Sequence, residues 1–241
     1  MQWRGGVSHL VFLKKVSESV SELSLPPRII RDRYEDPLSL IWLQCLASIG
    51  WHLERSSEVF ASWDGQKMLT IGVSEDLDPD DHLGQLILHE LCHALLEGER
   101  GRGLPDWGLA NTDGQHLVNE LACHRLQAHL ADQYHLRKLF AVTTDWRPYF
   151  DHIPKQALKK QSESQIREWA DRFGLSPSVA RSMDLTAIKR VEMICKAADE
   201  NQNILSHQDQ LILSSVHQAL SLSRELADLV AKLSLKNTLW S

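Results

Sequence analysis

The chain has 241 residues, of which 43% are hydrophobic and 24% are charged, as in a soluble globular protein with one good core and a smaller domain. No stretch approaches the roughly 18 apolar residues of a membrane span, and the apolar run at residues 7–13 is too short for a secretory segment, so we expect a cytoplasmic protein without a membrane partner. The formal net charge of -6 makes nucleic acid an unlikely general partner.

The first predicted elements are two helices and a hairpin. Residues 16–25 form a weak helical pattern that ends at Pro26-Pro27, and residues 37–48 form a stronger one with apolar side chains at helical spacing. Residues 58–63 and 67–73 have the composition of β-strands, and the Asp64-Gly65 pair between them is a favoured turn, so the sequence predicts a β-hairpin there.

The most informative pattern of the chain follows the hairpin, at His89-Glu90-Leu91-Cys92-His93. Asp78 predicts the N-cap of a helix and Gly98 predicts its end. Two histidines four residues apart lie on one face of such a helix and can hold Zn²⁺, while the intervening Glu90 can activate a water. The helix is apolar around most of its circumference and therefore belongs in a core, where Glu90 needs a compensating partner.

A catalytic zinc usually has three protein ligands and one open position, so a third ligand must come from elsewhere in the chain. A second helix is predicted from about residue 114 through Ala131, entered through the turn-like residues 111–114. On that helix His116, Glu120 and His124 follow one another at i, i+4 spacing and share one face. Each of the three is a candidate third ligand.

The chemistry of such a site assigns a role to Glu90. If the metal is zinc, its charge lowers the pKa of a bound water toward about 7, and Glu90 can accept the proton and pass it to the leaving amine. The developing oxyanion needs a further donor near the metal, for which the sequence offers several side chains without separating them. These are Tyr134, His129, His135, Arg125 and Tyr149.

The two helical motifs resemble those of a known class of enzyme. His89-Glu90-x-x-His93 followed by Asn119-Glu120-x-x-x-His124 is similar to the zinc metallopeptidases called gluzincins, over residues 50–135. The resemblance implies that Glu120 is the third ligand, and we rank His124 second and His116 third. Many gluzincins have an aspartate at the position of His124. In this chain His124 would either orient a histidine ligand or bind the metal itself. The resemblance also implies a short sheet whose edge strand, residues 69–73, pairs with extended substrate.

A second resemblance is to bacterial elongation factor P hydroxylases, which are oxygenases that modify a lysine-derived side chain of a translation factor. It covers residues 85–120 and rests on the order of His89-Glu90-x-x-His93, Gly98, Asp106-Trp107-Gly108, Asp113-Gly114 and Glu120. Leu109 and Ala110 stand where that family has aromatic residues. Two histidines and a carboxylate also suit Fe²⁺, so the ligand types alone do not separate the two reactions.

The remainder of the chain is predicted to be helical, over residues 163–173, 176–183, 185–198 and 208–235, after a break at residues 146–154. Residues 170–181 resemble a helix-turn-helix, a module that some cytoplasmic stress-response metallopeptidases carry. A DNA-binding role would be tested at Arg167, Arg172, Arg181, Lys189 and Arg190. We expect these helices instead to position a protein substrate or to pair two protomers as a homo-oligomer.

The sequence therefore predicts an α+β fold in two parts. Residues 1–153 are expected to form a small zincin-like catalytic domain, with a short antiparallel sheet and the active-site helices, and residues 154–241 an all-α domain. The expected function is a Zn²⁺-dependent metallopeptidase acting on protein or peptide, with His89, His93 and Glu120 as ligands and Glu90 as general base. The alternatives are an Fe²⁺-dependent hydroxylase and a metallopeptidase-type regulator with a helix-turn-helix-like module.

Overall fold

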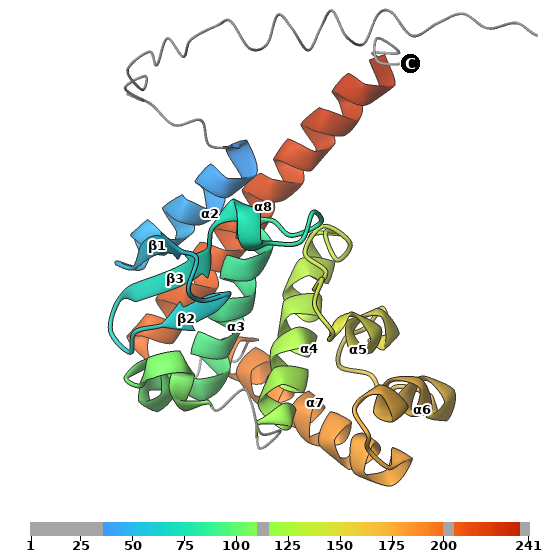
Figure 1. Cartoon of the computed structure of the whole chain (residues 1–241). Helices are drawn as coiled ribbons and strands as arrows, with labels where there is room; N and C mark the ends of the chain where they lie inside the picture. The colour runs from blue at the N-terminus through green and yellow to red at the C-terminus, as the bar shows by residue number, and fades with distance from the viewer. Residues whose placement is uncertain (1–35, 110–115, 200–204, 237–241) are drawn as a thin grey trace, which may run out of the picture. The chain divides into compact units, whose positions relative to one another are not determined.

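The computed structural model describes residues 36–109, 116–199 and 205–236, the last three of these by their backbone only (Figure 1). The helix predicted at residues 16–25 and the turn predicted at residues 111–114 lie outside the described residues. The described residues form a mixed α+β fold, mostly helical, with seven α-helices and a single three-stranded sheet.

The first helix, α2, spans Pro37–Ser48, as the sequence predicts. Asp36 caps it by accepting the N–H of Ser39 at 2.9 Å, and Pro37 occupies the first turn, where its missing N–H costs no helical bond. Trp42 is fully buried on the inner face of α2, and its Nε1 donates to Oγ of Ser223 at 3.2 Å. Ser223 belongs to the last helix, α8 (His207–Lys236), so the two ends of the described chain share one core.

The sheet contains β1 (His52–Ser56), β2 (Ala61–Trp63) and β3 (Met68–Gly72) in the order β1-β3-β2. The predicted hairpin is confirmed: β2 pairs antiparallel with β3, and the carboxylate of Asp64 accepts three N–H groups of the turn between them. The sequence analysis missed β1, a largely polar strand that pairs parallel with β3, so the sheet is mixed and the expectation of an antiparallel sheet is wrong for this pair. Because β3 lies in the middle of the sheet, the expectation that residues 69–73 form a free edge is wrong.

The motif helix, α3, spans Leu83–Arg102 and begins later than predicted. His82, not Asp78, is the N-cap, and its Nδ1 accepts the N–H of Gln85 at 3.1 Å. The Asp-Pro signal belongs instead to a separate turn, in which the N–H of Asp81 donates to the carbonyl of Asp78 at 2.9 Å. Gly98 interrupts the helical backbone at the predicted end with φ 61°, although one further turn follows it.

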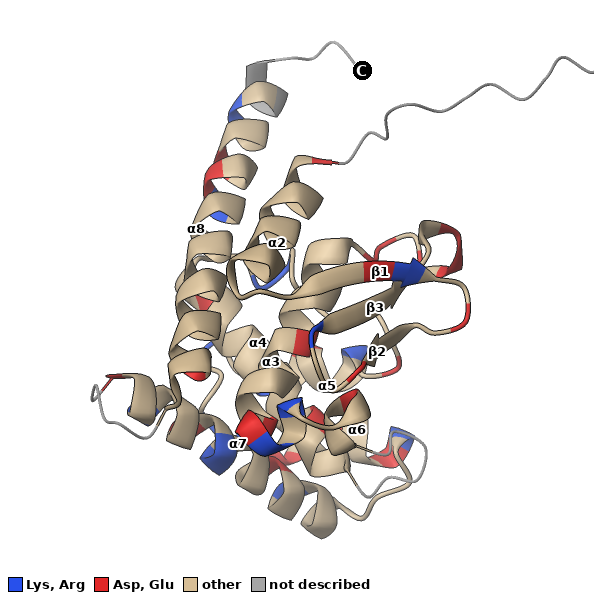
Figure 2. Cartoon of the chain, turned by 90° about the vertical axis from the view of Figure 1, so that its left-hand side faces the viewer, with Lys and Arg blue, Asp and Glu red and all other residues tan. Residues whose placement is uncertain are grey.

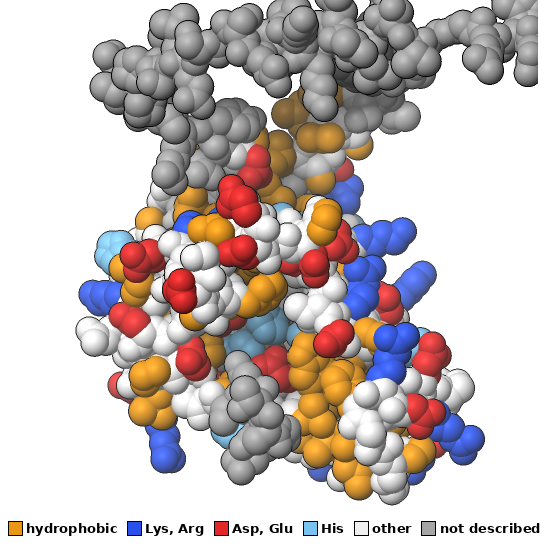
Figure 3. All heavy atoms as spheres, in the orientation of Figure 1, with side chains coloured by type: hydrophobic (Ala, Val, Ile, Leu, Met, Phe, Trp, Pro, Cys, Tyr) orange, Lys and Arg blue, Asp and Glu red, His pale blue; other side chains and the backbone are white. Residues whose placement is uncertain are grey.

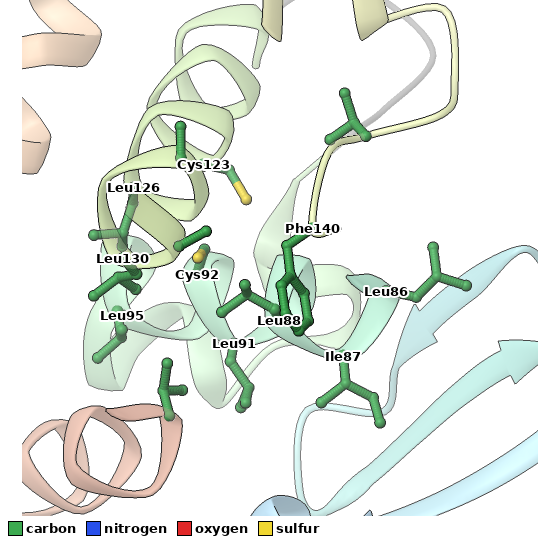
Figure 4. Packing of buried hydrophobic residues seen from close by; sticks show 14 of the residues in the cluster. Leu86, Ile87, Leu88, Leu91, Cys92, Leu95, Cys123, Leu126, Leu130 and Phe140 are labelled. Atoms are coloured by element: carbon green, nitrogen blue, oxygen red, sulfur yellow. The ribbon is translucent and has the colours of Figure 1, made fainter. Parts of the chain in front are cut away.

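Helix α3 is the centre of the hydrophobic core, with the strands on one side and α4 (Leu117–Gln133) on the other (Figure 4). Leu86 and Ile87 lie on the side of the strands, and Leu95 lies toward α4. All of these side chains are at most 5% exposed, so α3 is held on two sides. The packing on both sides fixes the position of α3 along its axis and its rotation about that axis, and so fixes where His89 and His93 face α4.

The remaining helices are α5 (Arg147–His152), α6 (Glu163–Arg172), α7 (Pro177–Asp199) and α8. Helix α7 is one continuous helix where the sequence pattern predicted two. Contacts cross the boundary predicted between residues 153 and 154: Nη2 of Arg125 in α4 lies 2.7 Å from Oδ1 of Asp184 in α7, and both side chains are buried. Figures 1 and 2 both show α8 beside α2. The helices after residue 153 therefore complete the core of the residues before it.

No helix of the described residues is long and apolar enough to cross a membrane. The C-terminal part of α8 extends past the other described elements (Figure 2). It carries Leu229, Val230 and Leu233, each at least 52% exposed. Pairing of protomers through the C-terminal helices stays a prediction, and this apolar stretch is the surface at which it can be tested.

Candidate metal centre

His89 and His93 of α3 meet Glu120 of α4. The Nε2 atoms of the two histidines are 3.2 Å apart. Oε1 of Glu120 lies 3.4 Å from Nε2 of His93, and Oε2 lies 3.7 Å from Nε2 of His89. The one-turn spacing on α3 places the histidines side by side, and the packing of α4 on α3 brings Glu120 to both.

These separations fit a common metal ion. Ligand atoms about 2.0–2.1 Å from a tetrahedral zinc are about 3.3–3.4 Å from each other. The three observed separations, 3.2, 3.4 and 3.7 Å, lie close to that value. Two imidazoles and a carboxylate are also a ligand set that zinc takes in hydrolytic enzymes and that Fe²⁺ takes in oxygenases. The residues therefore fit either ion.

The protonation of the three groups shows how strongly they interact. Burial raises the pKa of Glu120, but the nearby His93 and His89 outweigh it and hold that pKa far below its usual value. Burial lowers the pKa of His93, and the carboxylate of Glu120 more than offsets this and raises it. For His89 burial dominates and lowers the pKa. The centre thus contains an ionised carboxylate facing two imidazole nitrogens.

Gln127, one turn beyond Cys123 on α4, fixes the orientation of the His89 ring. Nδ1 of His89 donates to Oε1 of Gln127 at 3.1 Å, while Nε2 of Gln127 donates to the carbonyl of Phe140 at 2.8 Å. That second bond makes the oxygen of the Gln127 amide the acceptor, so His89 keeps its proton on Nδ1 and leaves Nε2 free to bind a metal. The sequence analysis missed Gln127, although it lies two turns after Glu120 on the same face.

Cys123 is a second residue that the sequence analysis missed. Its Sγ forms with His89 and His93 a group whose ligand atoms lie within 4.8 Å of one another, which makes it an alternative metal ligand. However, Sγ lies 3.4 Å from Nδ1 of His89 and 3.9 Å from Nε2, and the thiol donates to the carbonyl of His89 at 3.2 Å. Burial raises the pKa of this thiol. Glu120, already ionised and facing both Nε2 atoms, is the better donor.

Glu90 lies beside the centre and is 8% exposed. Its Oε2 accepts the indole N–H of Trp107 at 2.8 Å. Trp107 belongs to a short 3₁₀ segment, Pro105–Gly108, in the connection after α3. Glu90 therefore has the compensating partner that a glutamate in an apolar helix requires, and that partner is the indole N–H of Trp107.

A cavity of about 360 Å³ opens onto these groups. Figure 3 shows histidine and carboxylate atoms at the bottom of a hollow near the middle of the visible face. Beyond His89, Glu90, His93 and Glu120, the cavity is lined by residues from five parts of the chain. These are Phe60, Ala61 and Ser62 with Gln85 and Leu86; Asp106, Trp107 and Leu109; and His124 with Val142, Thr144, Asp145 and Trp146. The Asp and Glu side chains that line the cavity are Glu90, Asp106, Glu120 and Asp145, and its described lining contains no Lys or Arg.

His124 lines the cavity and is 1% exposed. Its ring lies 5.1 Å from the ring of His89 and 5.2 Å from that of Trp146. Neither ring nitrogen has a hydrogen-bond partner among the described residues. An unpaired buried polar group costs about 1–3 kcal/mol, so this imidazole is suited to a partner that enters the cavity. Burial lowers its pKa well below the usual value and keeps it neutral.

Other sequence candidates lie elsewhere. His116 precedes α4 and does not line the cavity. The five proposed oxyanion donors do not line the cavity either. Arg125 and Tyr149 are buried with Asp184, Tyr134 bonds His217, His129 bonds Gln133, and His135 follows the end of α4 in a left-handed conformation. The sequence could not separate donors on these elements because the direction of each side chain depends on tertiary packing.

Comparison of the chain with protein-family models, with curated proteins and with solved structures found no match. The resemblances to gluzincins and to elongation factor P hydroxylases therefore rest on the motif residues alone. The geometry of the centre is the independent evidence about what the chain does.

Proposed function

We propose that the chain is a zinc-dependent metallopeptidase with His89, His93 and Glu120 as metal ligands and Glu90 as general base. One observation carries the proposal: Nε2 of both histidines and the Glu120 carboxylate lie at ligand separations, with Glu90 beside them in one cavity. Zinc, when bound, would supply an acidified water and polarise the scissile carbonyl. A zincin-like identity of the fold is part of this proposal.

Glu90 would move the proton. Trp107 holds Oε2 of its carboxylate, which leaves Oε1 to accept a proton from the attacking water and return it to the leaving amine. His124 would hydrogen-bond the oxyanion that develops on the substrate, since its neutral ring can present an N–H to the cavity and has no described partner to lose. His124 thus takes the role that the sequence left open among five other residues.

Strand β2 supports a peptide as the substrate. The carbonyl of Phe60 and the N–H of Asp64 bond β3, so the backbone groups of the alternate residues Ala61 and Trp63 point to the other side. β2 is an edge strand and Ala61 lines the cavity, and although the N–H of Trp63 is bonded to Oδ1 of Asp106, the backbone of Ala61 can pair with an extended peptide. β2 thus takes the substrate-pairing role that the sequence analysis gave to residues 69–73. The carboxylates of the cavity favour a neutral or cationic segment over an anionic one.

Elemental analysis of the protein, purified without nickel, tests the metal. We expect about one zinc per chain in the wild type and none in His93→Ala. A protein without metal would contradict the proposal. For the third ligand, Glu120→Ala should weaken zinc binding by about 10-fold or more, and Cys123→Ala serves as the matched control. A loss confined to Cys123→Ala would transfer the ligand role to the thiol.

Peptide-library cleavage tests the reaction. Glu90→Gln preserves the shape of the side chain and removes its basicity, so it should keep the zinc and lose hydrolysis. Because general acid–base catalysis contributes about 10²–10⁴-fold, the loss should be of that order. Full activity of Glu90→Gln would remove the general-base assignment.

An iron-dependent hydroxylase is the second candidate. It is favoured by the position of Trp107, which belongs to the Asp106-Trp107-Gly108 motif of that resemblance and contacts Glu90. Iron in the purified protein, together with oxygen consumption and no peptide cleavage, would select this function.

The regulator with a helix-turn-helix-like module is less well supported. Arg181 pairs with Glu163 and Arg190 pairs with Glu97, so two of the five basic residues proposed for DNA are committed within the chain. DNA binding that weakens on neutralising Arg167 and Arg172 would support it.

A further inference from the structure

We propose that Trp107 is a positioning residue that holds the carboxylate of Glu90 toward the metal centre. The inference rests on the proposed function, because it concerns the group assigned there as general base. Its first support is the bond itself: Nε1 of Trp107 lies 2.8 Å from Oε2 of Glu90. Trp107 is 5% exposed and Glu90 is 8% exposed, so water has little access to replace the indole.

The indole ring is itself held in place. Trp107 stacks on Trp63 of β2 with ring centroids 4.8 Å apart and planes 4° from parallel. Trp51 lies 4.2 Å from Trp63 and 5.9 Å from Trp107, which closes a cluster of three aromatic rings. Nε1 of Trp63 donates to the carbonyl of Arg102 at the end of α3. The ring of Trp107 therefore has a fixed plane, and the direction of its N–H follows from that plane.

The backbone that carries Trp107 is strained. Asp106 and Trp107 have φ values of 47° and 60°, and Gly108 follows at 73°. A left-handed conformation costs about 1–2 kcal/mol for each residue other than glycine. The segment is kept in it by Oδ1 of Asp106, which accepts Oγ of Ser62 at 2.8 Å and the N–H of Trp63 at 3.1 Å. Strain that surrounding bonds maintain is typical of functional sites.

A second buried tryptophan shows what is particular to Trp107. Nε1 of Trp169 also donates to a side-chain oxygen, Oε1 of Gln161 at 2.6 Å, but neither residue lines the cavity. The acceptor of Trp107, by contrast, is a carboxylate in the cavity beside both histidine ligands. Glu90 has three side-chain torsions, so without the indole its carboxylate can leave the position from which it reaches the substrate.

The test compares Trp107→Phe with Trp169→Phe. Each variant removes an indole N–H and keeps an aromatic ring among buried aromatic neighbours, and only the first removes a bond to Glu90. We expect Trp107→Phe to keep its zinc and its KM and to lose kcat by about 10-fold or more, since the interaction acts on the chemical step. Trp169→Phe should retain the wild-type kcat. Equal kcat values in the wild type and Trp107→Phe would overturn the inference.

Nuclear magnetic resonance of the indole N–H groups gives a readout independent of activity. The resonance of Trp107, assigned by its loss in Trp107→Phe, should shift strongly in Glu90→Ala and stay in place in Glu97→Ala, whose carboxylate bonds Arg190 instead. A Trp107 resonance that ignores Glu90→Ala would also overturn the inference. A wild-type protein that cleaves no peptide would refute the proposed function, and the indole resonance would then decide the positioning inference by itself.

Discussion

Replacing Gln127 by leucine tests whether this buried amide prepares His89 for a metal. Gln127 is fully buried in α4 and makes two bonds, accepting Nδ1 of His89 at 3.1 Å and donating to the carbonyl of Phe140 at 2.8 Å. Leucine has a similar size and removes both bonds. The ring of His89 then loses the acceptor that keeps its proton on Nδ1 and its Nε2 toward Glu120.

The expected magnitude has two parts. Loss of a partner that orients a metal-binding histidine typically weakens metal binding by about 10–100-fold, which corresponds to about 1.4–2.7 kcal/mol. The carbonyl of Phe140, buried and left without this donor, costs about 1–3 kcal/mol of folding stability. Gln127→Leu should therefore bind zinc more weakly and should also unfold more easily when metal-free.

Two measurements separate these effects. Competition with a chromophoric chelator gives the zinc affinity, and urea unfolding of the chelated protein gives the stability. Gln161→Leu is the matched control, because it removes the acceptor of the Trp169 indole, neither residue lines the cavity, and the variant should therefore lower stability alone. If Gln127→Leu loses stability but binds zinc as tightly as the wild type, the orienting role is refuted.

Three further predictions follow from other parts of the chain. Burial lowers the pKa of His82 below 6.5, so the stability that its neutral, capping ring contributes is present above pH 6.5 and is lost as the pH falls through the lower pKa of the folded state. His82→Asn should therefore make the melting temperature depend less on pH in that range. An unchanged pH dependence in the variant would contradict the assignment. Arg125→Met leaves the charge of Asp184 buried without its partner and should lower the free energy of unfolding in urea by about 3–5 kcal/mol. If the double variant with Asp184→Leu loses as much stability as Arg125→Met alone, the ion pair is not the cause of the loss. If α8 joins protomers, glutamate at Leu229 and Leu233 should reduce the mass measured by light scattering, and an unchanged mass would exclude that surface.

The sequence by itself determined the elements whose signals are local. The bounds of α2 follow from Asp36-Pro37 and a helical apolar pattern, and those of α8 from a long one. The spacing of His89 and His93 placed them on one helical face, because four residues make about one turn. The β2–β3 hairpin followed from its strand composition and the Asp64 turn. Each of these depends on residues close together in the chain.

Only the tertiary structure decided which residues complete the site. His116, Glu120 and His124 follow one another at i, i+4 spacing, but α4 begins at Leu117 and leaves His116 outside the cavity. The packing of α4 on α3 makes Glu120 the group that faces both Nε2 atoms and leaves the ring of His124 without a hydrogen-bond partner among the described residues. Trp107 reaches Glu90 through a strained loop that bonds β2. Such distances are set by how separate elements pack, and packing follows from the shapes of many side chains together, which no spacing along the chain contains.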